Sequence, residues 1–547
     1  MPRNSKPTRK GKMSSGNFSQ STRCGRGYPR QFPNTHNRII GSPTDSPSTP
    51  SANQSRSYTG QYGHQGSPTS PSYASIFRFI SMPFPMRNGL FDVNGKVPHT
   101  VQEKWELLQS LSNIPKMKLP MTMAMETLIK KHTSGFGANI KFDLLHETVG
   151  QLPRGLVQRF DRFFHGMITL AQQLPFVLQK PVMPLAAGQN ASIVLTKREI
   201  ACLLANAFFC TFPFRDFINN PNYPRYPNVN FVSLFRKRDG RADKANAEKL
   251  KCLFEYFEKA NDFLTSQRGL EEVKFQRVCL DSKAIPKWDS SHTPMEKIYV
   301  VDPNEKLEEA TGLQVDFANK KIGGGVIGRG CVQEEIRFIT CPELIVARLF
   351  TEELQENEAL IVQGFEQFSS YEGYQETFKH TGPFSDPNYH RRTMIAIDAT
   401  DYTRAPDKRQ KKPFYKSLIP FGSSNDQDNG LYQYEKEAID RELNKAYAGF
   451  KCDSFAPEAH IATGNWGGGC FKGDPVLKAK IQHLAASQAG RNLLYYPFHD
   501  NNLKNMVESN VTKQVMVSNA YNELLKWANE KKKHLEENLK RTQKSRF

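Results

Sequence analysis

The spacing of apolar residues indicates a helical region in the first half of the chain. Over residues 76–227, apolar positions recur at helical intervals, as in VQEKWELLQSLSNI and METLIKKH, which predict surface helices with one buried stripe. The stretch from Leu195 to Phe212 is apolar on nearly all sides and begins with a T-x-x-E capping box at Thr196 and Glu199. We therefore expect an all-helical domain over 76–227, with this stretch as its buried central helix.

The pattern changes to short apolar runs that alternate with helical stretches over residues 228–525. The strand-like runs are VKFQRVCL, KIYVV, LQVDFA, ALIVQGF, MIAIDA, AHIATGNW and NLLYYPF. The helical stretches are NAEKLKCLFEYFEKA, PELIVARLFTEELQ, YEKEAIDRELNKAYAGF and DPVLKAKIQHLAASQAG. This alternation predicts an α/β domain with a largely buried sheet.

The two ends of the chain have a polar, basic composition. Residues 1–75 are rich in Ser, Pro, Gly, Gln and Asn, which predicts a disordered tail. Five Ser/Thr-Pro steps within it fit either a solvated linker or a target of proline-directed kinases. Residues 526–547 predict a second basic tail, helical or disordered, whose KKKH and KR are either a nuclear signal or lysines on a solvated helix face.

Most of the positive charge lies in these tails. The formal net charge is +19, of which residues 1–75 carry +9 and residues 527–547 carry +4. This distribution disfavours a uniformly basic nucleic-acid-binding domain, and we expect at most non-specific, salt-sensitive contacts of the tails with nucleic acid.

The sequence also restricts the expected compartment. No apolar run reaches the roughly 18 residues of a membrane span, and MPRNSKPTRKGK lacks the apolar core of a secretory signal. The first residues have a transit-peptide composition, but their Pro and Gly interrupt the amphipathic helix that mitochondrial import requires. The 9 cysteines occur singly, without a C-x-x-C pair, which favours a reducing compartment over a disulfide scaffold or structural zinc.

Two glycine triplets lie where a strand-like run is expected to lead into a helix. They are Gly323-Gly324-Gly325, before PELIVARL, and Gly467-Gly468-Gly469, before PVLKAK. Glycines at such junctions let backbone N–H groups approach an anion, and the helix N-terminus adds a favourable dipole. Two such loops predict a diphosphate held from both sides, although each triplet alone also fits an ordinary turn. Neither matches the P-loop or G-x-G-x-x-G spacing, so a usual ATP or NAD site is not implied.

A pair of adjacent glutamates follows the first triplet, in Gln333-Glu334-Glu335. Neighbouring side chains point about 100° apart on a helix and to opposite faces on a strand, so two such carboxyls in one pocket need different tasks. One would accept hydrogen bonds from sugar hydroxyls as an ionised group, while the other would stay protonated and donate a proton. The alternative is a solvated helix start, which is the commoner setting of a Glu-Glu pair.

The stretch LQVDFANKKIGGGVIGRGCVQEEIRFITCPELIVARLF resembles the signature of the poly(ADP-ribose) glycohydrolases, with its G-G-G-x7-Q-E-E core. The likeness extends to IACLLANAFFCTFP, RELNKAYAGF, ATGNWGGG and LLYYPF, and covers roughly residues 100–500. It implies a macrodomain, a three-layer α/β/α sandwich that binds ADP-ribose, packed against a helical accessory domain. It also implies mainly exo-type hydrolysis of the ribose–ribose O-glycosidic bonds of poly(ADP-ribose), which releases ADP-ribose through an oxocarbenium-like transition state.

The resemblance assigns roles to individual residues. Glu335 matches the general acid/base that protonates the leaving ribose oxygen, and Glu334 matches the carboxylate that positions the terminal ribose, aided by Asn319. Asp316 matches a third acid that supports the glutamates, and Gln333 adjoins them. The other implied substrate contacts are an adenine sandwich of Tyr374 and Phe498, and a second phosphate loop that includes Asn465, Gly467, Gly468, Gly469 and Phe471. No metal or cofactor is implied.

Some interpretations stay open at this point. The basic stretch from Thr403 to Tyr434 fits either a track for the anionic polymer or an inert surface insertion, and Phe471 fits either the reacting ribose or the core. The expected partners are poly(ADP-ribose) and poly(ADP-ribosyl)ated proteins, bound by a monomer in the nucleus and/or the cytoplasm as part of a DNA damage response. The alternatives are a non-catalytic ADP-ribose reader, which the presence of all three acids disfavours, and a nucleic-acid-binding protein.

Overall fold

The structure is a computed structural model that describes Met82 and residues 99–133, 140–215, 226–238, 240–385, 392–403, 430–452, 456, 459–509 and 515–544. The expected N-terminal tail with its Ser/Thr-Pro steps lies outside the described residues, as does most of the basic stretch from Thr403 to Tyr434. Among the residues that are described, no helix combines the length and the apolar character needed to cross a membrane.

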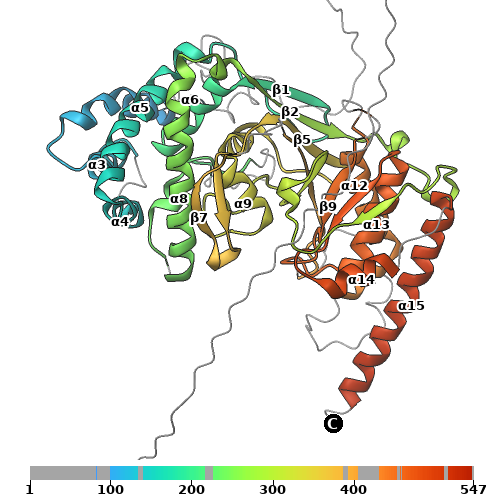
Figure 1. Cartoon of the computed structure of the whole chain (residues 1–547). Helices are drawn as coiled ribbons and strands as arrows, with labels where there is room; N and C mark the ends of the chain where they lie inside the picture. Colours follow the sequence, from blue (N-terminus) through green and yellow to red (C-terminus); the bar gives the residue numbers. More distant parts are fainter. Residues whose placement is uncertain are drawn as a thin grey trace, which may run out of the picture. The chain divides into compact units, whose positions relative to one another are not determined.

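The N-terminal part is built from amphipathic helices. They are α2 (His99–Ser110), α3 (Met121–Lys131), α4 (Asp143–Gly150), α5 (Arg154–Val177), α6 (Lys197–Phe208), the short α7 (Val232–Phe235) and α8 (Gly240–Ala260). Helix α6 is buried along almost its whole length and packs on α5, as the apolar pattern predicts (Figure 1). The predicted capping box is present: the Thr196 hydroxyl accepts from the Glu199 N–H, and the Glu199 carboxylate accepts from the Thr196 N–H at 2.7 Å.

One segment of the helical region is a strand. Residues Ala191–Thr196 form β1, which pairs antiparallel with β2 (Glu272–Cys279), and α6 begins at Lys197, directly after the predicted cap at Thr196. The run ASIVLT alternates exposed and buried side chains, and it completes the sheet by pairing with a strand far away in the sequence. The domain boundary expected at 227/228 stays a prediction, and β1 is a link across it.

An eight-stranded mixed sheet forms the centre of the α/β part, in the order β1-β2-β5-β8-β4-β9-β10-β3. The remaining bounds are β3 (Ile298–Val300), β4 (Leu313–Ala318), β5 (Glu358–Phe365), β8 (Arg392–Asp398), β9 (Ile461–Gly464) and β10 (Leu493–Tyr496). Strands β8, β4, β9, β10 and β3 run parallel, whereas β1, β2 and β5 join them through antiparallel pairs. All seven strand-like runs of the sequence are strands of this sheet.

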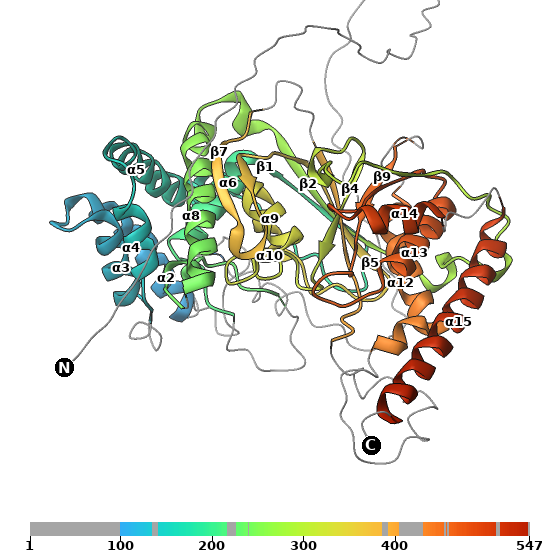
Figure 2. The ribbon, with the colours of Figure 1, turned by 60° about the horizontal axis from the view of Figure 1, so that its bottom comes forward.

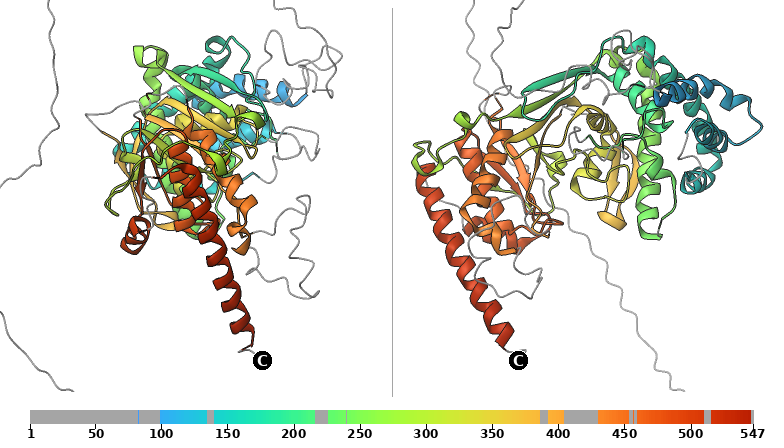
Figure 3. Two further views of the ribbon diagram at one scale, coloured as in Figure 1. Left: turned by 90° about the vertical axis from the view of Figure 1, so that its right-hand side faces the viewer. Right: turned by 180° about the vertical axis from the view of Figure 1, so that it is seen from behind.

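Helices cover both faces of the sheet. One face packs against α12 (Lys436–Phe450) and α13 (Pro475–Gln488), which in turn contact α14 (Asn501–Ser509) and α15 (Val517–Lys544). The other face packs against α9 (Gln333–Thr340) and the turns that follow it, which include α10 (Ala347–Phe350) (Figure 2). Figure 3 shows the long α15 lying against α13 and extending beyond it.

The side chains of the central strands alternate between two cores. In β8, Met394 and Ala396 belong to the core shared with the N-terminal helices, whereas Ile395 and Ile397 belong to the core under α12 and α13. A strand buried on both faces in this way has a continuous apolar run, which is why MIAIDA was recognisable in the sequence. The three-layer α/β/α class predicted from the sequence is confirmed.

Two other segments differ from the expected pattern. The helix expected over 342–355 is a 3-10 turn followed by α10 and ends at Phe350, because the chain then bridges to Leu185 through backbone hydrogen bonds. A separate two-stranded sheet, β6 (Ser369–Glu372) with β7 (Lys379–Pro383), lacks a clear apolar alternation and was not predicted. It leads into and out of the segment that holds Tyr374.

Candidate active site

The expected site residues gather at the carboxyl ends of the parallel strands. Asp316 lies in β4, the first glycine triplet follows that strand, and Gln333 begins α9. The second triplet follows the neighbouring β9 and precedes α13. Open α/β sheets bind ligands in the crevice outside the carboxyl ends of their strands, so the topology places both loops where a ligand is expected.

Both glutamates at the start of α9 are buried, which rules out the solvated helix start. Glu334 is 2% exposed and Glu335 is 7% exposed. The Glu334 carboxylate accepts from the backbone N–H of Gly323 at 2.6 Å and from that of Asn319 at 2.8 Å. Its two oxygens therefore tie the start of α9 to the end of β4.

The Glu335 carboxylate is held by the same loop from its other end. It accepts from the backbone N–H of Gly325 at 2.8 Å and from that of Val332 at 2.9 Å. The Val332 N–H is one of the free donors at the N-terminus of α9, so Glu335 also caps its own helix. Each glutamate is thus fixed by two backbone amides, and both carboxyls face one loop.

The first glycine triplet is shaped around these carboxyls. Gly324 has a φ of +43°, and a Cβ built on it would lie 2.5 Å from Glu335 Oε1 and 2.7 Å from Glu334 Oε2. The three amides of the triplet donate to Glu334, to the Lys321 carbonyl and to Glu335. In this structure each N–H of the triplet therefore has an acceptor inside the protein, and the expected contact of these amides with a phosphate stays a prediction.

Asp316 is fully buried beside the glutamates, and neither of its carboxyl oxygens has a hydrogen-bond partner among the described residues. Burial raises its pKa well above the usual range; the Arg337 guanidinium opposes this rise, and the charges of Glu335 and Glu308 add to it. A narrow recess, too small to hold a water molecule, adjoins this side chain and the Arg337 guanidinium.

The pKa of Glu334 is also raised well above its usual range. Burial is the main cause, and the neighbouring charges of Asp316 and Glu335 add to it, while the N–H groups of Asn319 and Gly323 oppose it. Asp316 and Glu334, crowded in one buried site, keep their protons to a higher pH than free carboxyls do. The arrangement therefore retains a proton, which is the property that a general acid site needs.

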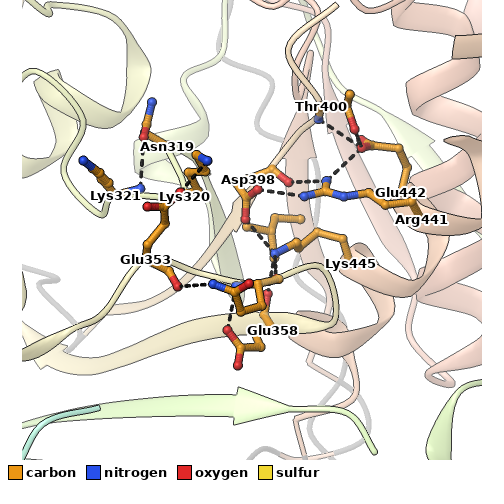
Figure 4. Close-up of polar contacts among 12 residues, drawn as sticks. Asn319, Lys320, Lys321, Glu353, Glu358, Asp398, Thr400, Arg441, Glu442 and Lys445 are labelled. Atoms are coloured by element: carbon orange, nitrogen blue, oxygen red, sulfur yellow. Dashed lines mark hydrogen bonds and ion pairs between the residues drawn. The ribbon is translucent and has the colours of Figure 1, made fainter. Parts of the chain in front are cut away.

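Gln333 and Asn319 support the backbone around the acids. The side-chain oxygen Oε1 of Gln333 accepts from the Phe317 N–H at 2.9 Å. The backbone N–H of Gln333 donates to the Tyr374 hydroxyl at 3.1 Å. The Asn319 side chain accepts from the Lys321 N–H at 3.0 Å (Figure 4). The backbone amide of Asn319, and not its side chain, donates to Glu334.

Tyr374 and Phe498 come together from distant parts of the chain. Their ring centroids lie 5.3 Å apart with an angle of 56° between the ring planes. A base stacked between two parallel rings would separate their planes by roughly 7 Å, twice the contact distance of carbon atoms. The structure confirms that the two rings are neighbours, but in this arrangement they touch each other. Phe498 is 55% exposed and has a φ of +54°, so it is the ring with room to move.

The second glycine loop is anchored at its start and open in its middle. Asn465 Oδ1 accepts from the Tyr495 hydroxyl at 2.8 Å, and the Trp466 indole N–H donates to the Ile397 carbonyl at 2.9 Å. Within the described part of the chain, the backbone amides of Gly469 and Phe471 have no acceptor. The middle of this loop, unlike the first glycine triplet, has free backbone donors for an anion.

The other positions of the second loop are fixed by packing and by turn hydrogen bonds. Gly467 has a φ of +71°, and a Cβ there would lie 2.6 Å from Ala399 Cβ. The Gly468 N–H donates to the Asn465 carbonyl at 2.9 Å. The half-buried Phe471 ring packs against the core under α12 and α13, which supports the core interpretation of this side chain.

A buried network of charges lies under the carboxyl end of β8 and was not predicted (Figure 4). Asp398 binds Arg441 at 2.8 Å and Lys445 at 2.6 Å, and Arg441 also binds Glu442 at 2.8 Å. Burial would raise the pKa of Glu442, but the positive charges of Lys478 and Arg441 lower it to about 2. The sequence carries no local sign of this network, because the network joins residues of α12 to one strand, β8, and to a second helix, α13.

The network reaches the second glycine loop through Lys478. This side chain is fully buried, forms an ion pair with Glu442 and lies 4.5 Å from the centre of the Trp466 ring. A Cβ on Gly467 would lie 3.3 Å from its Nζ. Lys478 therefore supports the loop from below.

Arg348 is a second residue that sequence reasoning missed. Its guanidinium donates to the carbonyls of Ile322 at 2.8 Å and Gly324 at 3.0 Å, and to that of Asn228 at 2.8 Å. Arg348 thereby fixes the carbonyl groups of the first glycine loop, while the amides of the same loop donate to the two glutamates. In the sequence it is one residue of an apolar stretch, and nothing in its spacing points to the loop.

Two family models match the chain. Residues 157–277 match the helical domain of poly(ADP-ribose) glycohydrolase, and residues 285–505 match its catalytic domain of macro domain fold. Poly(ADP-ribose) glycohydrolase 1 of Arabidopsis thaliana is 32% identical over 424 residues, which cover 65% of this chain and 75% of that protein. A probable poly(ADP-ribose) glycohydrolase 2 of the same plant is 29% identical over 440 residues, or 68% of this chain and 78% of that protein.

A third relative comes from an animal. Poly(ADP-ribose) glycohydrolase 2 of Caenorhabditis elegans is 32% identical over 302 residues, which cover 52% of this chain and 56% of that protein. Because the matched models include the central helix α6, nearly all of the sheet and both glycine loops, the fold, the site and the relatives agree. The chain belongs to the poly(ADP-ribose) glycohydrolase family.

Proposed function

We propose that this protein hydrolyses the ribose–ribose O-glycosidic bonds of poly(ADP-ribose), mainly from the end of the polymer, and releases ADP-ribose. The observation that carries the proposal is the pair Glu334 and Glu335, buried side by side and fixed on one glycine loop next to Asp316. Membership of the family supports the reaction class. The geometry supports the division of work among the acids.

Glu335 is the proton donor in this proposal, and Glu334 positions the terminal ribose. The two side chains start from neighbouring helical residues and reach different amides of the loop, so they face different atoms of a bound sugar. Glu335 would protonate the bridging oxygen as it leaves, and then accept a proton from the attacking water. Such help is worth roughly 10²–10⁴-fold in rate.

The crowded carboxyls are expected to stabilise the transition state of the reaction. As the glycosidic bond breaks, positive charge develops at the anomeric carbon in an oxocarbenium-like transition state. The raised pKa of Asp316 and that of Glu334 mean that ionised carboxylates are costly in the resting site. A cation forming beside them relieves that cost, so the interaction is stronger in the transition state than in the ground state.

The rest of the ligand is held at a distance from the reacting bond. The diphosphate would bind the second glycine loop, through the free amides of Gly469 and Phe471, and the adenine would stack between Tyr374 and Phe498 after the Phe498 ring moves outward. Stacking on an aromatic ring is worth about 1–3 kcal/mol per base. We further propose that the polymer is met on poly(ADP-ribosyl)ated proteins, in the nucleus and/or cytoplasm, by a monomeric enzyme.

The test is a product analysis of end-labelled poly(ADP-ribose) with the wild type and with Glu335→Gln. We expect the wild type to release ADP-ribose monomers, and the variant to bind ADP-ribose within a few-fold of wild-type affinity while most hydrolysis is lost. Turnover by the variant comparable with wild type would show that the acid is misassigned. Release of long fragments by the wild type would refute the exo-type cleavage, and binding without any turnover would leave a reader of ADP-ribose.

A further inference from the structure

A buried lysine of the helical part donates to the loop that holds Glu335. Lys249 lies on α8, is 0% exposed, and its ammonium donates to the carbonyls of Val326 at 3.3 Å, Gly328 at 2.8 Å and Gly330. An ammonium has three N–H donors, and all three are used here on one loop. The lysine and the loop are about 80 residues apart in sequence, and they belong to the two different family models.

The backbone of the loop that Lys249 binds also packs against the Glu335 carboxyl group. The Gly325 N–H donates to Glu335, and the Gly330 backbone lies so close that a Cβ there would be 2.4 Å from Glu335 Oε1. The amides of Gly325 and Val332, on either side of this loop, thus donate to the carboxyl, while three carbonyls within 326–330 accept from the ammonium. A displacement of these carbonyls also moves the backbone that contacts the Glu335 carboxyl, and the carboxyl moves with it.

An ammonium at this place is costly for the fold. Burial lowers the pKa of Lys249 to about 8, while Cys331, Glu335 and Cys252 oppose the shift and Arg238 adds to it. An apolar side chain of equal length would avoid the desolvation cost, but it would leave three carbonyls without a donor. The hydrogen bonds to the loop are therefore what the charged group contributes.

We propose that Lys249 is a positioning residue for catalysis, which fixes the 326–330 loop from the helical domain and thereby aims the Glu335 carboxyl at the bond to be broken. The proposal rests on the proposed hydrolysis and assigns to the helical domain a direct part in arranging the proton donor. It predicts that loss of the ammonium lowers kcat and leaves the binding of ADP-ribose largely intact, since Lys249 contacts neither the second glycine loop nor the two aromatic rings.

The experiment compares Lys249→Met with the matched variant Lys251→Met in the full chain. Lys251 lies on the same helix, and its side chain is 39% exposed and paired with Glu248. We expect Lys249→Met to lower kcat for poly(ADP-ribose) by about 10²-fold, the scale of a 1 Å misplacement, with ADP-ribose affinity within about threefold. Hydrogen exchange of the amides over 321–332 should become faster in this variant alone.

The pH profile separates positioning from a general loss of structure. Deprotonation of Lys249 removes one of the three donors, so the kcat of the wild type should fall above about pH 8, whereas the low kcat of Lys249→Met should not fall further there. If Lys249→Met does not fold, Lys249→Gln, which still offers two donors, takes its place with a smaller expected loss of kcat.

The proposal is overturned if the lysine variant keeps wild-type kcat, or if loop exchange is unchanged while kcat falls. An equal loss in Lys251→Met would also overturn it. Failure of the wild type to cleave poly(ADP-ribose) would instead refute the proposed function, and the exchange measurement, which needs no substrate, would still report whether Lys249 holds the loop.

Discussion

Replacing Gly324 by alanine would place a methyl group between the two glutamates. The new Cβ would lie 2.5 Å from Glu335 Oε1 and 2.7 Å from Glu334 Oε2, about 1 Å closer than ordinary van der Waals contact allows. The carboxyls cannot retreat freely, because each accepts from two backbone amides, and hydrogen bonds to charged groups contribute about 1.5–3 kcal/mol.

The expected magnitude follows from this geometry. A misplacement of about 1 Å at the reacting groups costs roughly 10²-fold in rate. The backbone adds a separate cost, since a φ of +43° is unfavourable for alanine by about 1–2 kcal/mol. We therefore expect kcat/KM for poly(ADP-ribose) hydrolysis by Gly324→Ala to fall about 10²-fold, while the free energy of unfolding falls by only a few kcal/mol.

The matched control is Gly490→Ala, just after α13. Gly490 has a φ of +68°, and an added Cβ would meet nothing within 4 Å. This variant carries the same kind of backbone cost without a contact to the acids, so it should lose stability and keep full activity. Wild-type activity in Gly324→Ala, or an equal loss of activity in Gly490→Ala, would refute the steric reasoning.

Three further predictions concern the acids, the aromatic rings and the buried network. Asp316 releases its proton at a higher pH in the folded state than in the unfolded chain, where it does so near pH 4, so this residue lowers stability progressively as the pH rises above about 4. The change in the free energy of unfolding caused by Asp316→Asn, measured by denaturant unfolding, should therefore be more favourable at pH 7 than at pH 4. An equal change at both pH values would contradict the raised pKa. Tyr374→Ala and Phe498→Ala should each weaken ADP-ribose binding by about 1–3 kcal/mol in calorimetry, and unchanged affinity in both would exclude the adenine sandwich. Lys478→Met removes one of the two cations that pair with the buried Glu442 carboxylate and should lower the free energy of unfolding by about 3–5 kcal/mol. Lys436→Met removes an exposed pair and should cost at most about 1 kcal/mol, so similar losses in the two variants would argue against the buried pair.

The sequence by itself determined the class of fold and the chemistry-bearing residues. Runs such as MIAIDA and LQVDFA are buried on both faces, and the Thr196 capping box marks the start of α6, so local pattern was enough to predict these elements. The order Gly-Gly-Gly to Gln-Glu-Glu likewise singled out the acids. Apolar periodicity carries this information because it reports which face of a single element is buried.

Only the tertiary structure decided what the glycines and the cations do. Gly323 and Gly325 turn their amides to the glutamates, which no spacing rule distinguishes from a phosphate loop. Lys249 and Arg348 reach the same loop from other elements, and β1 joins the sheet by pairing with a strand far away in the sequence. These contacts depend on the direction of each hydrogen-bonding group after the chain has folded. A local pattern of apolar and polar residues does not record that direction.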